Sequence, residues 1–287
     1  MSVNKGRTKN DSLIPRKVGS WRYMMDKTLA LPDTSSSSQL AIPYSKYFTE
    51  LQTVQSSQAT SVYQANLVSS DRLIPVFIKQ FHFRSRTDRC KHLVRKSRAL
   101  RAVEADDLLH RHGLVAPRTL ILGWHQKYTV KNNFFTVTTA LEGYKNIYDQ
   151  ISAVSGQGKE AKREFIIALA KEIARLHGAK ISHGDMRAGN IMSKYDNAWQ
   201  FAFIDNERTR KHLRLPTKIR VKNLVQLNLL LSPNISRADR LRFFETYCND
   251  CFGSLNRDLL TRVLKKTRQR TARLLSNNRI QQSDIWY

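Results

Sequence analysis

Cysteine is scarce in this sequence, which holds three cysteines among 287 residues. That number is too small for the disulfide framework of a small secreted domain. Cys248 and Cys251 form a lone C-x-x-C, without a second pair or histidines at the spacing of a zinc site. We therefore expect two small packed residues there and no metal or redox centre, and free thiols agree with a reducing compartment.

Long apolar runs are also missing. None approaches the ~18 residues that a membrane-spanning helix needs. Residues 1–21 are polar and basic, unlike the apolar centre of a signal peptide. The hydrophobic fraction of 41% is ordinary for a globular protein. These features predict a cytosolic protein with one or two hydrophobic cores.

Acidic residues are the third shortage, because 23 Asp and Glu stand against 49 Lys and Arg and give a net charge of +26. The excess is concentrated in residues 84–101, 207–222 and 257–279. Such a charge attracts anionic partners, and nucleic acid, an anionic membrane leaflet and an acidic glycolipid are all candidates. Solvated helix faces that keep the protein soluble are the alternative explanation.

The order of expected elements divides the chain into an arm and two lobes. Residues 1–39 are polar, end in a serine run and lack a period, so they predict a basic, poorly ordered arm. Residues 40–143 form the first expected lobe, with one long helix among strands. We expect its hairpin at 54–67, a strand at 73–83, the helix at 87–112 and strands at 120–123 and 134–141.

The second expected lobe, residues 144–287, is mostly helical. Residues 160–177 place Phe165, Leu169 and Ile173 on one helical face, and Gly178 follows the last turn. Two short apolar runs flank a turn at Asp196 and Asn197. Further helices are expected at 237–248 and 255–275. The fold class is therefore α+β, with a β-rich first lobe and a helical second lobe.

The segment with the clearest chemistry is residues 181–192, which read H-x-D-x-x-x-x-N over His183, Asp185 and Asn190. Fifteen residues after Asn190, an apolar run ends in Asp205. Phosphoryl transfer explains this spacing: the first Asp orients the substrate hydroxyl or accepts its proton. The Asn and the second Asp supply oxygen ligands to Mg²⁺ on the nucleotide phosphates. The alternative is a polar loop in which Asp185 caps a turn and Asn190 bonds the backbone.

Two charged residues near this segment are further candidates. Arg187 lies where a cation can neutralise the transferred phosphoryl group, although it could be one more surface arginine. The second metal segment reads Asp205-Asn206-Glu207, and Glu207 could supply another carboxylate to the metal.

Upstream residues agree with a nucleotide site. Lys79 ends the strand segment Val76-Phe77-Ile78-Lys79, in which a lysine can bind the α and β phosphates. Its expected carboxylate partner on the following helix is Glu104, with Asp106 and Asp107 as neighbours in the sequence.

The loop that would cover the phosphates, residues 56–63, contains no glycine. Small polar residues such as Ser57 and Thr60 could approach phosphate in place of glycine amides, or the segment could be an ordinary hairpin turn. Leu141 and Glu142 end the last strand of the first lobe. They are the expected hinge, where backbone groups would bind adenine.

These motifs together resemble the bacterial lipopolysaccharide core kinases, the Kdo and heptose kinases related to InaA-type proteins. The resemblance covers roughly residues 44–275 and includes two narrower matches, residues 113–118 and 236–244. It is carried by Phe77-Ile78-Lys79, Leu141-Glu142-Gly143, residues 183–192 and Phe203-Ile204-Asp205.

The resemblance implies a two-lobed protein-kinase-like fold and an enzyme that uses ATP and Mg²⁺ to phosphorylate a sugar hydroxyl of the lipopolysaccharide inner core. It makes Asp185 the base, Asn190 and Asp205 the metal ligands and Lys79 the phosphate-binding lysine. It also implies a partner, lipopolysaccharide core or another anionic glycolipid, and a peripheral position on the anionic inner face of the bacterial inner membrane.

Two other functions stay open at this point. One is a protein or small-molecule kinase on the same catalytic core, although an Ala-Pro-Glu segment and an evident activation loop are missing. The other is a pseudokinase or a module that binds an anionic polymer, which the joint presence of Lys79, Asp185, Asn190 and Asp205 disfavours. Nucleic acid is disfavoured as a partner because no aromatic stacking signature occurs.

Overall fold

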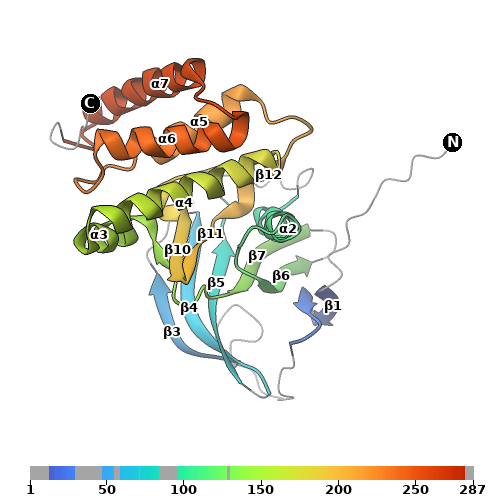
Figure 1. Ribbon diagram of the computed structural model, residues 1–287. Helices are drawn as coiled ribbons and strands as arrows, with labels where there is room; N and C mark the ends of the chain where they lie inside the picture. The colour runs from blue at the N-terminus through green and yellow to red at the C-terminus, as the bar shows by residue number, and fades with distance from the viewer. Residues whose placement is uncertain are drawn as a thin grey trace. The chain divides into compact units, whose positions relative to one another are not determined.

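The computed structural model describes residues 13–29, 47–54, 59–70, 72–83, 96–127 and 130–281. The chain divides into two compact units (Figure 1). The first comprises residues 1–107 with 117–141, and the second comprises residues 108–116 with 142–287. The expected boundary at residue 143 lies close to this division, which falls between Leu141 and Glu142.

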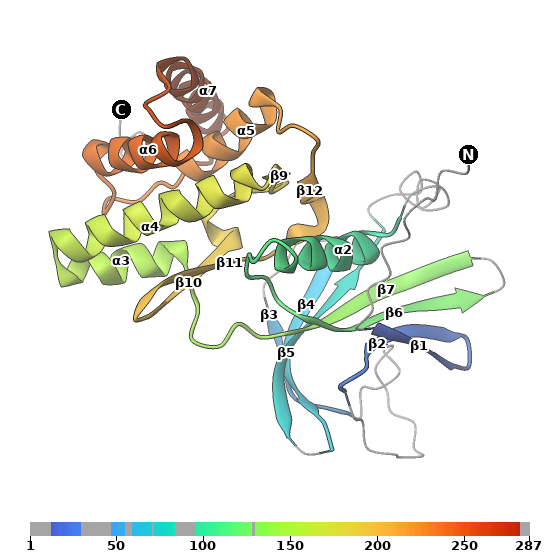
Figure 2. The ribbon, with the colours of Figure 1, turned by 45° about the vertical axis from the view of Figure 1, so that its right-hand side comes forward.

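The first unit is built on a seven-stranded sheet whose neighbouring strands are all antiparallel. The strand order is β1-β2-β6-β7-β5-β4-β3, and Figure 2 shows the paired hairpins from the side. The strands are β1 Leu13–Val18, β2 Trp21–Asp26, β3 Phe48–Val54, β4 Thr60–Val68, β5 Leu73–Phe81, β6 Thr119–Lys127 and β7 Val130–Thr139.

Alternating apolar residues form the core of this sheet. Val76 and Ile78 of β5 are fully buried, as are Ile121 of β6 and Val137 of β7, because successive side chains of a strand point to opposite faces. Helix α2, Arg98–His110, packs Ala99 and Val103 into a smaller cluster with Leu13, Phe81 and Leu122. The strand–helix–strand pattern expected for this part of the chain is therefore confirmed.

The expected poorly ordered arm is wrong for residues 13–29. This segment forms the β1–β2 hairpin, which turns at Gly19 with a φ of 55° and pairs β2 with β6. In β1 the side chain of Leu13 is buried, whereas the next four are exposed, so the strand carries almost no apolar period. Tyr23 and Met25 of β2 bury their side chains in the core of the sheet.

The second unit contains helices, a small three-stranded sheet and a two-stranded ribbon. Its elements are β8 Lys145–Asn146, α3 Ile147–Gln157, α4 Lys159–Gly178, β9 Ile181–Ser182, η2 Ala188–Asn190, β10 Ile191–Asp196, β11 Ala198–Phe203, η3 Asn206–Arg208, β12 Arg210–Lys211, α5 Thr217–Asn228, α6 Arg237–Phe252 and α7 Arg257–Ser276.

The predicted apolar face of α4 is the centre of this unit. Phe165, Leu169 and Ile173 are buried in one cluster with residues of α3, α5, α6 and α7. The β10–β11 hairpin turns at Asn197 with a φ of 55°, where the sequence predicted a turn. The predicted helices at 160–177, 237–248 and 255–275 are all present with slightly different ends.

The predicted helix at 87–112 is confirmed from Arg98 to His110, and residues 84–95 lie outside the described part. Within the described ranges, no helix is long and apolar enough to cross a bilayer. Cys248 is buried and Cys251 is half-buried, both as free thiols.

Candidate active site

The loop between β9 and β10, residues 183–190, carries the predicted residues Asp185, Arg187 and Asn190, and we name it the catalytic loop after that prediction. Two bonds close it: Arg187 N donates to Asp185 O at 2.8 Å, and Asn190 Nδ2 donates to the same oxygen at 2.8 Å. The Asn190 bond uses the amide nitrogen, so its carbonyl oxygen is the atom suited to a metal. The motif spacing of five residues thus corresponds to a closed turn.

His183 joins this loop to the segment that carries Asp205. Asp185 N donates to His183 Nδ1 at 3.2 Å, so the proton of the neutral ring lies on Nε2, which donates to Ile204 O at 3.1 Å. Complete burial lowers the pKa of His183 against the opposing effects of Ile204 O and the two Asp side chains. The ring is therefore neutral and holds a defined tautomer.

Asp205 follows β11 in a left-handed backbone conformation, with a φ of 61° and a ψ of 42°. Ile204 N donates to Asn190 O at 3.0 Å, which ties this segment to the end of the catalytic loop. Asp205 is exposed, whereas Glu207 is buried with Arg208 3.9 Å from its carboxylate. The structure thus brings Asp185, Asn190 and the segment of Asp205 and Glu207 together within one unit.

The carboxylate of Asp185 is held by two side chains. Arg187 donates to both of its oxygens, at 3.0 Å from Nε and 2.6 Å from Nη2. Gln226 of α5 donates from Nε2 to Oδ1 at 3.0 Å. Such bidentate and multiple bonds fix the orientation of a carboxylate better than one bond does.

Two polar residues of α5 that contact the loop were not among the site residues predicted from the sequence. Gln226 Oε1 accepts from Met186 N at 3.3 Å, and Asn223 Nδ2 donates to His183 O at 2.5 Å. Both side chains are buried. The signal for them was present, because Asn223 and Gln226 lie among the apolar residues Val221, Leu224, Val225 and Leu227, and buried amides need partners.

A buried chain of hydrogen bonds supports Asn223 from behind. His177 Nε2 lies 3.2 Å from Asn223 Oδ1, and its Nδ1 lies 2.8 Å from the hydroxyl of Tyr247. Arg220 donates to that hydroxyl. Burial, together with the charge of Arg220, lowers the pKa of His177 to about 3, so this ring also stays neutral.

Gly184 is required by the close approach of another segment. A Cβ at this position would lie 2.0 Å from Arg208 Cβ and 2.7 Å from the Arg208 carbonyl oxygen. No real Cβ comes this close to backbone. The residue between His183 and Asp185 therefore has to lack a side chain.

The remaining predicted residues lie in or next to the first unit. Lys79 is half-buried on β5, with Nζ 5.5 Å from the centre of the Phe81 ring. Thr60 is buried at the start of β4, and Ser57 lies outside the described residues. Leu141 is half-buried and Glu142 is exposed at the division between the units.

The predicted partnership of Glu104 with Lys79 is not found. Glu104 forms its ion pair with Lys96, at 2.5 Å, and this pair is largely exposed. Lys96 lies two residues before the start of α2 and reaches Glu104 within that helix, whereas Lys79 lies on β5. A contact within ten residues of sequence thus replaces the expected contact between helix and sheet.

The oxygen ligands fit magnesium better than a transition metal. Within the described ranges, no three residues among His, Cys, Asp and Glu gather closely enough to hold a metal by themselves. Mg²⁺ usually keeps waters and binds one or two carboxylates together with substrate phosphates. Asn190, Asp205 and Glu207 offer such a partial set.

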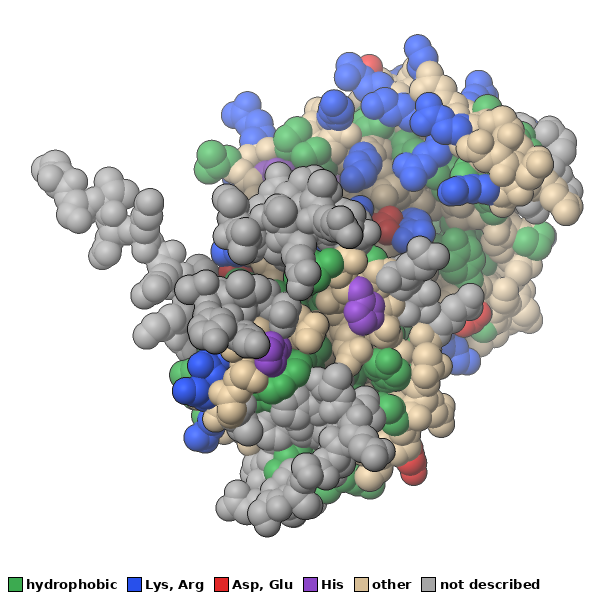
Figure 3. All heavy atoms as spheres, turned by 180° about the vertical axis from the view of Figure 1, so that it is seen from behind, with side chains coloured by type: hydrophobic (Ala, Val, Ile, Leu, Met, Phe, Trp, Pro, Cys, Tyr) green, Lys and Arg blue, Asp and Glu red, His purple; other side chains and the backbone are tan. Residues whose placement is uncertain are grey.

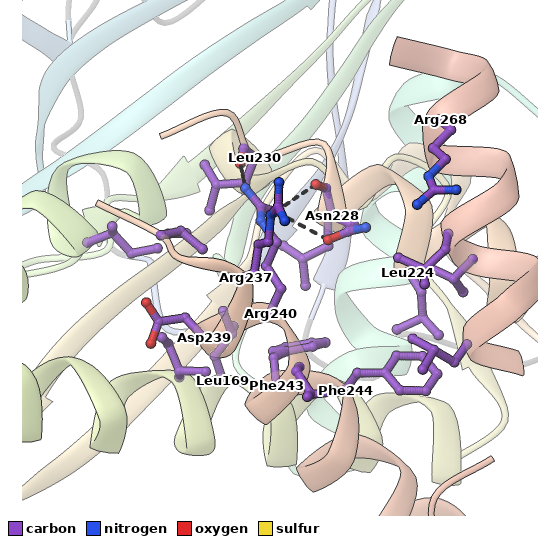
Figure 4. A pocket seen from close by; sticks show the side chains of 18 residues that line it. Leu169, Leu224, Asn228, Leu230, Arg237, Asp239, Arg240, Phe243, Phe244 and Arg268 are labelled. Carbon is purple, nitrogen blue, oxygen red and sulfur yellow. Dashed lines mark hydrogen bonds between the residues drawn. The ribbon is translucent and has the colours of Figure 1, made fainter. Parts of the chain in front are cut away.

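A separate cavity of about 320 Å³ lies among α3, α4, α5, α6 and α7. Its lining is mostly apolar, with Leu169, Leu224 and Phe244 among the side chains in Figure 4. Arg240 donates to the carbonyl groups of Asn228 and Leu230 at its edge. None of the predicted site residues lines it, so it is not where the phosphoryl chemistry would take place.

Comparison with solved structures finds the same fold. The chain is similar to a structure described as "WaaP in complex with acyl carrier protein", with a TM-score of 0.52 and 19% identity. The match covers 76% of this chain and 89% of that chain. It confirms the α+β kinase-like fold, with its antiparallel sheet and its mostly helical second part.

Comparison with curated proteins finds no match. A profile of the family described as "Lipopolysaccharide kinase (Kdo/WaaP) family" matches residues 59–247, about two thirds of the chain. The matched region runs from β4 to α6 and contains the whole catalytic loop. The match confirms the predicted resemblance to the lipopolysaccharide kinases. It does not confirm the predicted relation to InaA-type proteins. The chain belongs to the lipopolysaccharide kinase (Kdo/WaaP) family.

Proposed function

We propose that this protein transfers the γ-phosphoryl group of ATP to a sugar hydroxyl of the lipopolysaccharide inner core, on Kdo or heptose. The observation that carries the proposal is the orientation of Asp185. Its carboxylate is held by Arg187 and Gln226, and its backbone is held by His183. A fixed carboxylate beside an acceptor hydroxyl is what phosphoryl transfer requires of the protein.

Asp185 is proposed to orient the acceptor hydroxyl and to accept its proton as the new P–O bond forms. Arg187 is proposed to have a second role, because its side chain is about two thirds exposed and its guanidinium can turn to the transferred phosphoryl group. Arg187 would thus hold the Asp185 carboxylate before transfer and contact the phosphoryl group during transfer.

Magnesium would be held by Asn190, Asp205 and Glu207 together with the nucleotide phosphates. When bound, it neutralises phosphate charge. The exposure of Asp205 and the left-handed backbone at that residue support this assignment. Glu207 supports it less directly, because its side chain is buried beside Arg208.

ATP is proposed to bind through Lys79 at its phosphates, with Ser57 and Thr60 near the covering loop. Leu141 and Glu142 would offer backbone groups to adenine. Glu104, paired with Lys96 here, would reach Lys79 only after leaving that partner. The protein is proposed to work peripherally at the inner face of the bacterial inner membrane.

Two alternatives remain as competing proposals. A protein or small-molecule kinase would use the same catalytic loop with another acceptor. A pseudokinase that binds an anionic polymer would keep the basic surface and transfer nothing. The complete set of contacts around Asp185 favours an enzyme, because a module that only binds does not need an oriented carboxylate.

The test is transfer of labelled γ-phosphate from ATP with Mg²⁺ to dephosphorylated lipopolysaccharide core, beside a generic protein and a control without acceptor. Asp185→Asn keeps the shape and removes the charge, and it should lower the rate by about 10²–10⁴-fold. The matched control is Asp196→Asn, an exposed carboxylate at the end of β10, which should leave the rate unchanged.

Label on the core that is lost in Asp185→Asn establishes the enzyme and its acceptor class together. Label on the protein substrate alone moves the proposal to a protein kinase. Normal turnover in Asp185→Asn, with unchanged thermal unfolding of both variants, would contradict the mechanism.

A further inference from the structure

The turn between β12 and α5 exposes one leucine completely. The side chain of Leu213 is 98% exposed, whereas Leu215, two residues further on, is buried at 8%. Isolated exposed apolar residues are common on protein surfaces and need no explanation by themselves. The surroundings of Leu213 are what distinguish it.

The turn is held on both sides of this residue. His212 N donates to Lys180 O at 2.9 Å, and His212 Nε2 lies 2.8 Å from Ser182 Oγ. After Leu213, the buried side chain of Leu215 anchors the chain, and Pro216 O accepts the first bonds of α5. Leu213 therefore projects from a fixed turn and not from a frayed segment.

Exposed basic residues flank the exposed leucine on both sides in the sequence. We name as the basic loop surface Leu213 with the six exposed bases Arg208, Arg210, Lys211, Arg214, Lys218 and Lys222. Residues 208–222 include no acidic residue, and the nearest acid in the sequence, Glu207, is buried. Figure 3 shows Lys and Arg side chains gathered over the part of the second unit that carries α5, α6 and α7.

This surface adjoins the catalytic loop within the same unit. Strand β12 pairs with β9, which leads directly into His183 and Asp185. Lys222 Nζ donates to Gly184 O at 3.3 Å, and Arg208 packs against Gly184. Whatever binds the basic loop surface therefore lies beside Asp185.

We propose that the basic loop surface docks the protein on an anionic lipid bilayer, with Leu213 inserted into the interface and the bases on the lipid headgroups. The purpose of this docking rests on the proposed function, because it would bring Asp185 to a hydroxyl presented on a lipid anchor. The docking itself does not depend on that function. The bases alone would suit any polyanion, but an apolar tip gains free energy only where water is excluded.

Nucleic acid fits the same surface less well. Proteins that bind single-stranded nucleic acid combine Lys and Arg side chains with aromatic side chains on which the nucleobases stack. Residues 208–222 contain no Phe, Tyr or Trp. The one aromatic ring in the segment, that of His212, is bonded to Ser182. The lipid interface uses both the charge and the leucine, so it accounts for more of what is observed.

The first experiment measures binding of the full chain to sedimented vesicles of phosphatidylcholine with and without one quarter phosphatidylglycerol. Binding should require the anionic lipid. Arg210→Gln with Arg214→Gln should lower the partition coefficient about 25-fold, the equivalent of about 1 kcal/mol for each base. Leu213→Ser should lower it about tenfold, because the buried apolar area is lost.

The matched control is Lys265→Gln with Lys266→Gln on α7, which removes the same charge from another exposed basic face. It should change the partition less than twofold. An equal loss in both double variants would show that net charge alone drives binding, and it would overturn the assignment of this surface.

A second readout locates the inserted residue directly. Leu213→Trp should add a blue-shifted emission component that brominated lipids quench, whereas Tyr195→Trp, at a side chain that is 61% exposed on β10, should add one that stays unquenched. Absence of quenching at position 213 would contradict insertion. Loss of duplex or single-stranded RNA binding in the Arg210 and Arg214 variant, with vesicle binding intact, would assign the surface to nucleic acid instead.

Failure of the proposed function would look different. Vesicle binding needs no catalysis, so an inactive protein still tests the docking proposal. Conversely, Leu213→Ser should phosphorylate a delipidated, soluble core oligosaccharide at the wild-type rate and lose rate only on core presented in vesicles.

Discussion

Gly184 shows how a single missing side chain sets the geometry of the catalytic loop. Gly184→Ala would place a methyl group against the backbone of Arg208, so one of the two segments has to move. We expect at least a tenfold loss of phosphoryl transfer and a loss of about 1–3 kcal/mol in the free energy of unfolding. Steady-state kinetics and urea denaturation measure the two effects.

The matched control for this substitution is Gly156→Ala on α3. Nothing lies within 4 Å of a Cβ at Gly156, and alanine is the better helix former, so the variant should gain about 0.5–1 kcal/mol at unchanged activity. Wild-type kinetics in Gly184→Ala would show that the loop does not depend on this close approach.

Gln226 is expected to act as a positioning residue for Asp185. Gln226→Met keeps the length and volume of the side chain but removes the bonds to Asp185 Oδ1 and Met186 N. We expect kcat to fall about tenfold with an unchanged KM for ATP, because orientation is lost and nucleotide contacts are not touched. A rise in KM alone would assign Gln226 a binding role and contradict positioning.

The turn that holds the candidate catalytic residues could be predicted because their relations are local in the sequence. Asp185 and Asn190 lie in one turn of the chain, so their spacing alone encodes the geometry. Gln226 lies 41 positions from Asp185, and the fold alone brings the two together. The partner of Glu104 was mispredicted for the same reason, since several bases, among them Lys96 and Arg101, lie within eight residues before this carboxylate and are all candidates.

At the scale of elements, a capping box at Ser236, the residue before α6, stabilises the start of that helix. Ser236 Oγ accepts from Asp239 N at 3.1 Å, and Asp239 Oδ2 accepts from Ser236 N at 3.0 Å and lies 3.2 Å from Lys162 Nζ. Ser236→Ala removes one side of this capping box and should cost about 1 kcal/mol of unfolding free energy.

The control for the cap is Ser254→Ala, at an exposed residue after α6, and it should cost less than 0.5 kcal/mol. Chemical denaturation of both variants gives the comparison. Equal, small losses would show that packing of α6 against α4 makes the cap redundant.

Neither helices nor strands were predicted completely, because α3 and α5 were not expected as separate helices and β1 and β2 were not expected as strands. Helices α4, α6 and α7 each carry an apolar period and an end signal within a short window, and they fold where that period indicates. Strand β1 is an edge strand with one buried residue among its first five, so its sequence reads as a polar arm. Its order comes from pairing with β2, which no local pattern records.

At the scale of the whole molecule, two buried histidines make stability depend on pH. The pKa of His177 is about 3 in the folded state and about 6.5 when unfolded, and the pKa of His183 is lowered as well. Between about pH 6.5 and pH 3, the unfolded chain therefore binds more protons than the folded chain does. Stability is complete above about pH 6.5 and falls as the pH drops towards 3.

We expect the free energy of unfolding to fall by about 1.4 kcal/mol per pH unit through His177 between pH 6 and 4.5, and His183 should add a loss in the same direction. His177→Gln should flatten this slope by one proton, whatever it does to stability itself. Denaturant titrations at several pH values give the slope. Asp26 and Asp239, whose pKa values are lowered, add their own loss only below pH 4. An unchanged slope in His177→Gln would place the linkage elsewhere.

Side chains, and not the backbone of a helix or a sheet, make the hydrogen bonds to the backbone groups of His183, Asp185 and Met186. The amide protons of Asp185 and Met186 go to His183 and Gln226, and Asn223 holds the His183 carbonyl group. The Met186 amide can exchange with solvent deuterium only when Gln226 of α5 withdraws, and Asn223 of α5 holds the carbonyl group of the residue that binds the Asp185 amide. We therefore expect the loop that carries Asp185 to open together with α5, and its Met186 amide to exchange no faster than the amides of that helix.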